Sequence, residues 1–252
     1  MGALDPETRR KLREMRVPEL ADAIEEVWAD PGFANVAPME RLSAAVDRAW
    51  DVMRSANVER LITRAHLRER QADIGRVVYE GRPLDRDKVL ELGTCGFMEY
   101  HRDVILEGFT GTGKTWLACA LARQACRHGY NAMYVRMPDL FLAREEWLSS
   151  GRSESKFLRK YSNFGMLVLD EWLIDPLTPE QTRFVFELVE RRYDRGSNVF
   201  CTQYPFAEWH QRLGGGAHAD AIMDRIAHNS ISIDMGTRNM REVTSTVASG
   251  KA

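Results

Sequence analysis

One stretch of the chain carries residue types whose spacing suits the binding of a phosphate group. It reads Gly108-Phe109-Thr110-Gly111-Thr112-Gly113-Lys114-Thr115 and satisfies the pattern GxxxxGK[ST] in full. Glycines let such a loop turn successive backbone N–H groups toward phosphate oxygens, in conformations that a Cβ would obstruct. Lys114 is expected to place its ammonium against the β and γ phosphates, and the Thr115 hydroxyl to ligate Mg²⁺. The sequence therefore predicts that the chain binds ATP together with Mg²⁺.

The flanking segments match the elements that this loop requires. Residues 104–106 are apolar and predict a strand before the loop, and residues 116–125 predict a helix after it. The N-terminus of that helix adds its positive dipole end to the phosphate site. We expect the nucleotide to be held by the loop and the start of the helix: Gly108, Thr110, Gly111, Thr112, Gly113, Lys114, Thr115 and Trp116.

A pair of acids follows the apolar run at residues 166–169. A buried parallel strand delivers the residues after its carboxyl end to a ligand site, so Asp170 is expected to hold Mg²⁺ through its water shell. Glu171 is then the candidate general base that orients and deprotonates the attacking water. A kinase acting on a small acceptor needs the same two elements, so the pair favours hydrolysis without proving it.

A polar residue also follows the apolar run at residues 199–201. Gln203 is placed to position a water beside the γ-phosphate, although an ordinary strand end has the same appearance. Arg225, in a helical stretch at residues 220–228, and Arg241, near the C-terminus, are single arginines. Their spacing alone indicates surface residues.

Short apolar runs alternate with helical patterns through most of the chain. Five strands are predicted, at residues 104–106, 132–135, 166–169, 199–201 and 231–233. This alternation predicts an α/β domain with a mainly parallel sheet. Before residue 80 the chain is rich in helix formers, and Leu42, Val46, Ala49 and Met53 repeat at the spacing of one helical face. We therefore expect a helical N-terminal domain at residues 1–80, for adaptor, DNA or partner contacts, and an ATPase domain at residues 81–252.

Composition limits the classes of partner. The 252 residues include 35 Lys plus Arg and 37 Asp plus Glu, so any nucleic-acid contact must come from a local patch. The four cysteines, Cys95, Cys119, Cys126 and Cys201, form no CxxC pair, which favours buried thiols in a reduced compartment over zinc ligands. No apolar run approaches the roughly 18 residues that span a bilayer. A cytoplasmic protein without membrane contact is expected.

Two basic clusters are candidates for DNA contact. Arg60, Arg64 and Arg68 recur every four residues, which predicts a basic stripe on one helical face. The second cluster lies around the Ser/Gly-rich turn after the second strand: Arg152, Lys156, Arg159 and Lys160. A solvated helix face or loop explains each cluster equally simply.

The chain resembles the IstB-like proteins, ATPase helpers of bacterial transposases in the AAA+ clade that includes the DnaC-type helicase loaders. The resemblance covers nearly the whole chain and is strongest in four stretches: residues 94–97 (TCGF), 108–122 (GFTGTGKTWLACALA), 190–194 (ERRYD) and 219–229 (ADAIMDRIAHN). It implies a three-layer P-loop NTPase of the AAA+ type behind a small helical domain. Phe109 departs from the family's usual proline, and Glu171 stands where the family has a second aspartate.

The resemblance also implies roles that spacing does not give. Gln203 takes the polar sensor position at the end of the fourth core strand, and Arg225 becomes an arginine finger that reaches the γ-phosphate of a neighbouring subunit. Self-assembly into a homo-oligomer, and binding of double-stranded DNA with little sequence preference, follow from the same resemblance. Arg241 matches a family arginine, but the segment before it is one residue longer than usual, so its role stays open.

Three hypotheses for the function are consistent with the sequence. The leading one is an AAA+ ATPase that assembles on DNA when ATP is bound and recruits or activates a transposase. A DnaC-type loader of a replicative helicase would share the ATPase domain and differ in the partner of its N-terminal domain. A phosphotransferase or a nucleotide-binding scaffold without hydrolysis is the third reading, because fold and loop alone do not fix function.

Overall fold

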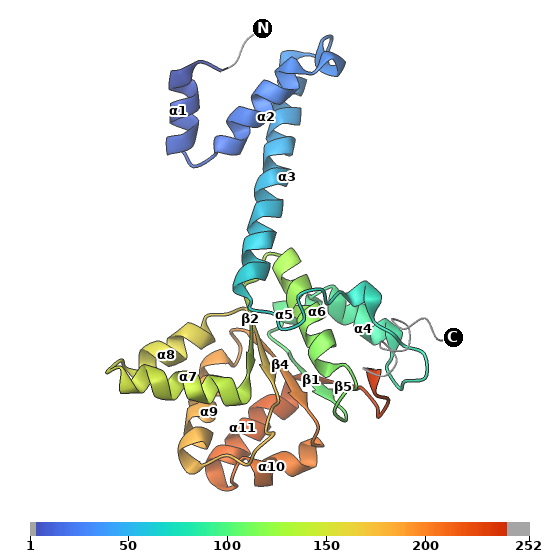
Figure 1. Ribbon diagram of the computed structural model, residues 1–252, viewed down its shortest axis with the longest axis vertical. Helices are drawn as coiled ribbons and strands as arrows, with labels where there is room; N and C mark the ends of the chain where they lie inside the picture. The colour runs from blue at the N-terminus through green and yellow to red at the C-terminus, as the bar shows by residue number, and fades with distance from the viewer. Residues whose placement is uncertain (1–3, 241–252) are drawn as a thin grey trace. The chain divides into compact units, whose positions relative to one another are not determined.

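The computed structural model describes residues 4–240, and the chain divides into two compact units (Figure 1). One unit extends to Arg60 and the other begins at Leu61. This division comes earlier than the boundary expected near residue 80. The reason is that apolar side chains of residues 61–79, including Ala65, Leu67 and Ala72, belong to the core of the second unit.

Prolines start the helices of the N-terminal unit. Its elements are α1 (Pro6–Glu14), α2 (Pro18–Ala29), the 3₁₀ helix η1 (Pro31–Phe33) and α3 (Pro38–Arg64), which begins in this unit. A proline in the first turn fixes a helical φ and removes an N–H that has no partner there. The prolines that break the helical pattern in the sequence are therefore the first residues of successive helices.

The core of the N-terminal unit is small. Ala23 and Val27 of α2 pack against Ala45 and Ala49 of α3. The helical spacing of Leu42, Val46, Ala49 and Met53 is confirmed by α3, but of these four only Ala49 is buried, and Leu42 and Val46 are exposed. The alanines allow α2 to approach α3 closely, which leaves the larger side chains of α3 outside.

The second unit is built on a five-stranded parallel sheet, as expected. Its strands are β1 (Asp103–Glu107), β2 (Ala132–Arg136), β3 (Met166–Asp170), β4 (Ser197–Thr202) and β5 (Ser230–Asp234). They lie in the order β2-β3-β4-β1-β5, and every pair is parallel. The carboxyl ends of all strands consequently lie along the same edge of the sheet.

Helices cover both faces of the sheet and make the three layers that were expected. The helical elements in chain order are η2 (Ile74–Arg76), α4 (Arg86–Gly93), α5 (Gly96–Glu99), α6 (Lys114–Arg127), α7 (Met137–Ser149), α8 (Glu154–Ser162), α9 (Pro179–Arg192), η3 (Phe206–Glu208), α10 (Trp209–Arg212) and α11 (Gly216–His228). Val104 and Leu106 of β1 face the cluster that contains α6, whereas Ile105 faces the cluster that contains α9 and α11. Because successive side chains of a strand point to opposite faces of the sheet, β1 contributes side chains to both cores.

A buried polar chain ties α9 to the start of the sheet. Arg192 of α9 is fully buried and donates from Nε to Asn198 Oδ1 at 2.5 Å. Asn198 in turn donates its N–H (2.6 Å) and its Nδ2 (2.9 Å) to Asp103. Burial raises the pKa of Asp103 to about 7 and lowers the pKa of Arg192 to about 10. The Arg192 guanidinium also donates to the carbonyl oxygens of Tyr161, Phe164 and Ser197, so this residue of the ERRYD stretch has a structural role.

The cysteines and the helices bear on two further expectations. All four cysteines are buried free thiols, as predicted. In residues 4–240 we find no helix that combines the length and the apolar character needed to cross a lipid bilayer.

Candidate functional site

The loop after β1 has the backbone that its glycines predict. Gly111 and Gly113 adopt φ values of 86° and 87°, which L side chains rarely tolerate. A Cβ on Gly111 would lie 2.3 Å from Asn239 Oδ1, so close approach as well as conformation requires glycine there. Gly108 N donates to Thr202 O at 3.2 Å and fixes the loop to the end of β4.

Lys114, the first residue of α6, reaches back across the loop. Its ammonium donates to the carbonyl oxygens of Gly108 (2.6 Å) and Phe109 (2.9 Å). The positive charge therefore lies over the loop, beside the N-terminus of a 14-residue helix, where an anion is favoured. That this ammonium meets the β and γ phosphates stays a prediction.

Thr115 and Asp170 meet at the edge of the sheet. Thr115 Oγ1 donates to Asp170 Oδ2 at 2.8 Å, and the Tyr134 hydroxyl donates to the same oxygen at 2.7 Å. Asp170 is 3% exposed. Tyr134 pairs with Val168 in the register of β2 and β3, so it lies on the same face of the sheet as Asp170. Burial, with the neighbouring Asp170 carboxylate, raises the pKa of Tyr134 and keeps it a hydrogen-bond donor.

Glu171 begins a turn with unusual backbone geometry. It adopts φ 56°, and so does Leu173 two residues later, in the left-handed region that non-glycine residues rarely enter. Arg136, at the end of β2, contacts the Glu171 carboxylate at 2.6 Å, and Arg68 contacts it at 3.8 Å. The hydrogen bond to Glu171 raises the pKa of Arg136. The carboxylate is thus at the site but is engaged by two guanidinium groups.

Gln203 follows β4 and lies against the phosphate loop. Its Oε1 accepts a hydrogen bond from Thr110 Oγ1 at 3.2 Å, and its Nε2 donates to the Tyr204 hydroxyl at 3.1 Å. The structure therefore brings Gln203 to the loop. Trp116 is half-buried and packs against the α6-side core, where its ring supports the start of α6.

The structure adds residues that sequence reasoning missed. Arg82 donates to the Thr112 carbonyl at 2.6 Å, and Met240 N donates to the Gly111 carbonyl at 2.8 Å. Tyr134 and Arg136 also join the site, one on Asp170 and the other on Glu171. No spacing marks these residues, because their contacts depend on which strands and loops become neighbours.

Arg225 lies away from the phosphate loop of its own chain. It sits near the end of α11, which leads directly into the start of β5, whereas the phosphate loop follows the end of β1. Because β1 and β5 are parallel, Arg225 lies at the amino ends of the strands, whereas the phosphate loop lies at their carboxyl ends. Arg225 forms an ion pair with Glu190 of α9, and its guanidinium carbon lies 5.3 Å from the centroid of the Phe186 ring.

The first basic cluster does not form the predicted stripe. α3 ends at Arg64, and His66 takes φ 51°, so Arg68 does not continue the helical face of Arg60 and Arg64. Arg68 instead contacts Glu171. The expectation of one helical face for the three arginines is wrong for Arg68.

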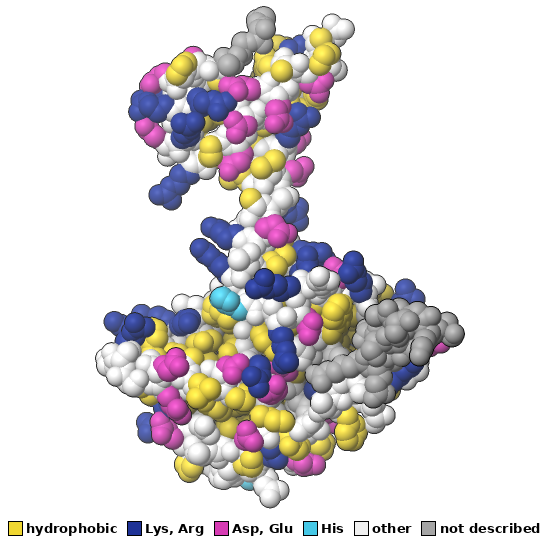
Figure 2. Space-filling model, in the orientation of Figure 1, with side chains coloured by type: hydrophobic (Ala, Val, Ile, Leu, Met, Phe, Trp, Pro, Cys, Tyr) yellow, Lys and Arg dark blue, Asp and Glu magenta, His cyan; other side chains and the backbone are white. Residues whose placement is uncertain are grey.

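The second basic cluster is exposed, with Arg152 in the turn between α7 and α8 and its other members on α8. Arg152, Lys156, Arg159 and Lys160 all lie at the surface. Figure 2 shows Lys and Arg side chains gathered over this end of the sheet unit. Arg152 stacks on Trp147, with 4.6 Å between its guanidinium carbon and the ring centroid. Arg241 lies outside the described residues.

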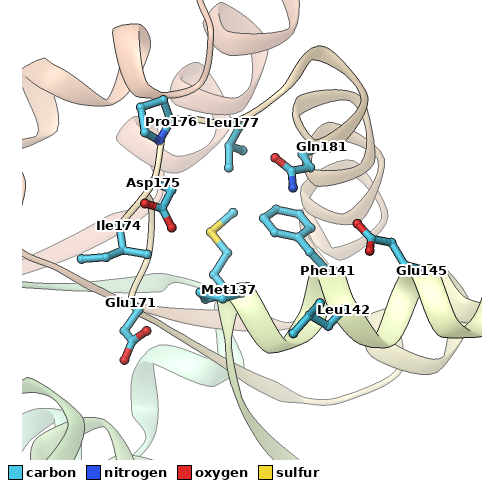
Figure 3. Close-up of a pocket in the computed structure, with 11 residues that line it drawn as sticks. Met137, Phe141, Leu142, Glu145, Glu171, Ile174, Asp175, Pro176, Leu177 and Gln181 are labelled. Atoms are coloured by element: carbon cyan, nitrogen blue, oxygen red, sulfur yellow. The ribbon is translucent and has the colours of Figure 1, made fainter.

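A pocket of 260 Å³ adjoins the turn that carries Glu171. Figure 3 shows Met137 and Phe141 of α7 facing Leu177 across it, with Glu171 at one end. Most of its walls are apolar, and the turn at residues 171–177 forms one side. Glu171 and α7 therefore line the same pocket.

Comparison with known proteins gives consistent matches. A family model described as IstB-like ATP binding protein matches residues 10–248. The chain is 31% identical over 238 residues to y4pL of Sinorhizobium fredii, an insertion-sequence ATP-binding protein by its name, covering 93% of this chain and 95% of that one. It is also 31% identical over 204 residues to the IS1162 ATP-binding protein of Pseudomonas fluorescens, covering 79% and 86% of the two chains. Among solved structures, the DnaC helicase loader superposes with a TM-score of 0.54 at 20% identity, over 65% of this chain and 96% of that one.

Proposed function

Because the chain belongs to the IstB-like ATP-binding proteins of insertion sequences, we propose that it hydrolyses ATP to help a transposase act on DNA. The observation that carries this proposal is the convergence of Lys114, the Thr115–Asp170 pair and Gln203 around one loop. In the proposal, ATP binding drives assembly on double-stranded DNA. The assembly then recruits and activates the transposase.

The phosphate loop binds the triphosphate through its backbone N–H groups and Lys114. The ammonium exchanges the carbonyls of Gly108 and Phe109 for β and γ phosphate oxygens, which carry more negative charge. The dipole of α6 favours the same anion. These contacts bind and orient the substrate for in-line attack.

Thr115 and Asp170 suit Mg²⁺, because both present hard oxygen atoms and lie 2.8 Å apart. Residues 4–240 contain no group of three or more His, Cys, Asp or Glu side chains arranged as a metal site. A Mg²⁺ ion held mainly by phosphates and water needs only a pair such as this one. When bound, the ion neutralises charge on the β and γ phosphates. Tyr134 fixes the orientation of Asp170.

Glu171 is the general base of the proposed reaction, and it must leave its arginines to act. Arg136 contacts the Glu171 carboxylate at 2.6 Å, so this contact must be exchanged before the carboxylate can hydrogen-bond a water. Binding of ATP brings a second anion toward the same guanidinium groups and offers them another partner. Gln203 hydrogen-bonds the water from the β4 side of the loop.

Arg225 completes the site of a neighbouring subunit in this proposal. Its position at the amino ends of the strands supports action between chains, because it does not approach the phosphates of its own chain. The charge that develops on the transferred phosphoryl group is stabilised by such a guanidinium. Hydrolysis then depends on assembly.

DNA contact is proposed for the exposed basic residues. Reversing the charges of Arg152 and Lys156 together is expected to abolish DNA retention and to leave nucleotide affinity unchanged. A second variant reverses the charges of the other candidate pair, Arg60 and Arg64, both of which lie in α3. Filter binding at several salt concentrations measures both, because each lost phosphate contact lowers the salt dependence. Retention at low salt by both variants would exclude both clusters.

The transposase is favoured as partner over a replicative helicase by the extent of the sequence matches. The insertion-sequence protein of Sinorhizobium fredii matches across 93% of this chain, including most of the N-terminal unit, whereas the DnaC structure covers 65%. The helicase loader remains the second candidate on the fold similarity. A pull-down with the N-terminal unit, residues 1–60, as bait, offered the cognate transposase or the host helicase, separates them.

Steady-state ATPase assays with and without DNA test the function as a whole. We expect hydrolysis that DNA alters, and a larger particle with a slowly hydrolysed ATP analogue than without nucleotide. The matched control is Glu171→Gln, which should bind ATP and assemble without turnover. A protein that hydrolyses no ATP and does not change size with nucleotide would refute the proposal.

A further inference from the structure

A row of apolar side chains lies exposed along α3 in the N-terminal unit. Met39 is 72% exposed, Leu42 38%, Val46 48% and Trp50 65%, and half-buried Met53 extends the row. Figure 2 shows hydrophobic side chains at the surface of the helix that Figure 1 labels α3. We call this row, from Met39 to Met53, the α3 stripe. An exposed indole within a continuous apolar row marks a contact surface more often than a solvated one.

The α3 stripe is narrow and continuous. At about 100° per residue, its five side chains fall within an arc of about 80° centred on Val46. The core of the unit uses the adjoining face, through Ala45 and Ala49. The stripe is therefore left over after the unit has formed its own core.

The spacing of the stripe is symmetric about Val46. Successive members are three, four, four and three residues apart: Met39, Leu42, Val46, Trp50 and Met53. In a two-fold symmetric contact each residue meets its counterpart in reverse order, so the surface must be complementary to itself. A second copy laid antiparallel would place Val46 against Val46, Leu42 against Trp50 and Met39 against Met53.

This pairing sets the largest side chain of the stripe against a smaller one. The indole of Trp50 meets Leu42, and the two valines allow close approach at the centre, as interdigitating helices require. A parallel arrangement would instead oppose two indoles at one level and two valines at the next. The antiparallel register therefore fits the volumes better.

We propose that α3 of one chain packs antiparallel against α3 of a second copy, with a two-fold axis at Val46. This contact differs in kind from the one that Arg225 would make. An arginine that serves the next subunit requires a head-to-tail contact, whereas the α3 stripe pairs with itself. The stripe contact needs no nucleotide, so it stands or fails apart from the proposed function.

Cysteine cross-linking of the full-length chain, without nucleotide, tests the register. Val46→Cys should cross-link to itself with a short bis-maleimide, since both side chains lie at the axis. Leu42→Cys should not, because two such residues lie about 12 Å apart along the axis. A mixture of Leu42→Cys and Trp50→Cys should give the mixed dimer. The native cysteines are buried, which keeps the background low.

The matched control for position is Asp51→Cys, which is exposed on α3 and points about 140° away from Val46. It should not cross-link. Equal cross-linking of Asp51→Cys and Val46→Cys, or self-cross-linking of Leu42→Cys, would overturn the antiparallel pairing.

A second measurement uses sedimentation equilibrium without nucleotide. Trp50→Ala should weaken the dimer roughly thirtyfold or more, as loss of a central tryptophan does. Val52→Ala removes another exposed apolar side chain (53% exposed) outside the stripe and should leave the dimer unchanged. Circular dichroism checks that both variants keep their helices. A monomeric wild-type chain, or equal effects of the two variants, would refute the proposal.

Discussion

The two units of the chain bury apolar side chains of different size. The sheet unit encloses Trp172, Trp209 and Phe200 in the core between the sheet and the helices α9 and α11. The N-terminal unit buries alanines and Val27, and it exposes Trp50. Because stabilisation grows with the apolar area removed from water, burial of apolar side chains stabilises the sheet unit more than the N-terminal unit. The difference shows that the sheet unit places its largest apolar side chains in its core, whereas the N-terminal unit leaves large side chains such as Trp50 at its surface.

Removing the loop lysine should give the largest effect, a loss of ATP turnover in the sheet unit without a change in the stability of either unit. Lys114→Ala is expected to lower ATP turnover by about a thousandfold or more, because residues 108–115 contain no other cation. The free energy of unfolding of both units should stay within about 0.5 kcal/mol. Turnover assays and urea melts measure both quantities. Lys88→Ala, which changes a lysine bonded to the Ser232 carbonyl, is the control.

Arg225→Ala should lower turnover of the assembled protein by about a hundredfold or more. Mixing it with Lys114→Ala should restore part of the activity, since each variant supplies what the other lacks. Arg191→Ala, which alters an arginine paired with Glu187 at 3.9 Å, should have little effect. A mixture that stays inactive would contradict action between chains.

Glu190→Gln, which changes the ion-pair partner of Arg225, should reduce ATP turnover less than Arg225→Ala does, and should add no further loss in an Arg225→Ala background.

Val27→Ala should weaken the N-terminal unit alone. Deleting two methyl groups from a core of four buried side chains is expected to cost about 2 kcal/mol. Hydrogen exchange of α2 and α3 amides measures the local change. ATP turnover of the sheet unit should remain at the wild-type value. Loss of turnover in this variant would mean that the two units are not energetically separate.

Tyr134→Phe should raise the Mg²⁺ concentration for half-maximal turnover by about tenfold. The change removes the 2.7 Å hydrogen bond that orients Asp170 and leaves the ring in place. Tyr161→Phe, at another buried tyrosine of the sheet unit, is the control. Equal Mg²⁺ requirements for the two variants would argue against a positioning role for Tyr134.

Asp103→Asn should change how stability depends on pH. Burial raises the pKa of Asp103 to about 7, from an ordinary value of 3.8. Between these values the folded chain keeps a proton that the unfolded chain has lost, so this group destabilises the fold as pH rises. The variant should therefore gain stability relative to wild type from pH 5 to pH 8, by an amount on the order of 1 kcal/mol. Urea melts at several pH values measure the difference; a constant difference would contradict the shifted pKa.

Local patterns predicted the parts of the molecule that depend on local sequence. All five strands lie where apolar runs were found, and each extends the predicted run by one to three residues in total. The phosphate loop and the position of Asp170 after β3 were also predictable, because each is a contiguous motif with a fixed chemical purpose.

Contacts between distant segments were not predictable. Arg136 and Arg68 reach Glu171 only because β2 lies beside β3 and the chain turns at His66, and neither fact is encoded in spacing. The helical stripe of arginines failed for the same reason, since a non-glycine residue with positive φ ends the pattern without a warning signal. The helical spacing of Leu42, Val46, Ala49 and Met53 is confirmed by α3, but it did not show which face is buried, because apolar residues outnumber the buried positions on α3 and periodicity cannot say which face the chain itself covers.

The placement of Arg225 and the phosphate loop at opposite ends of the strands has an arithmetic consequence. If each finger serves the next subunit, an open row always ends in one subunit whose nucleotide lacks a finger. A row of n subunits then contains n − 1 complete sites, and a closed ring contains n. ATP turnover per subunit should consequently rise with row length toward a plateau. Subunits of a short row should therefore hydrolyse ATP more slowly than those of a long row, and the short row should last longer. The length of the row would set its lifetime on DNA.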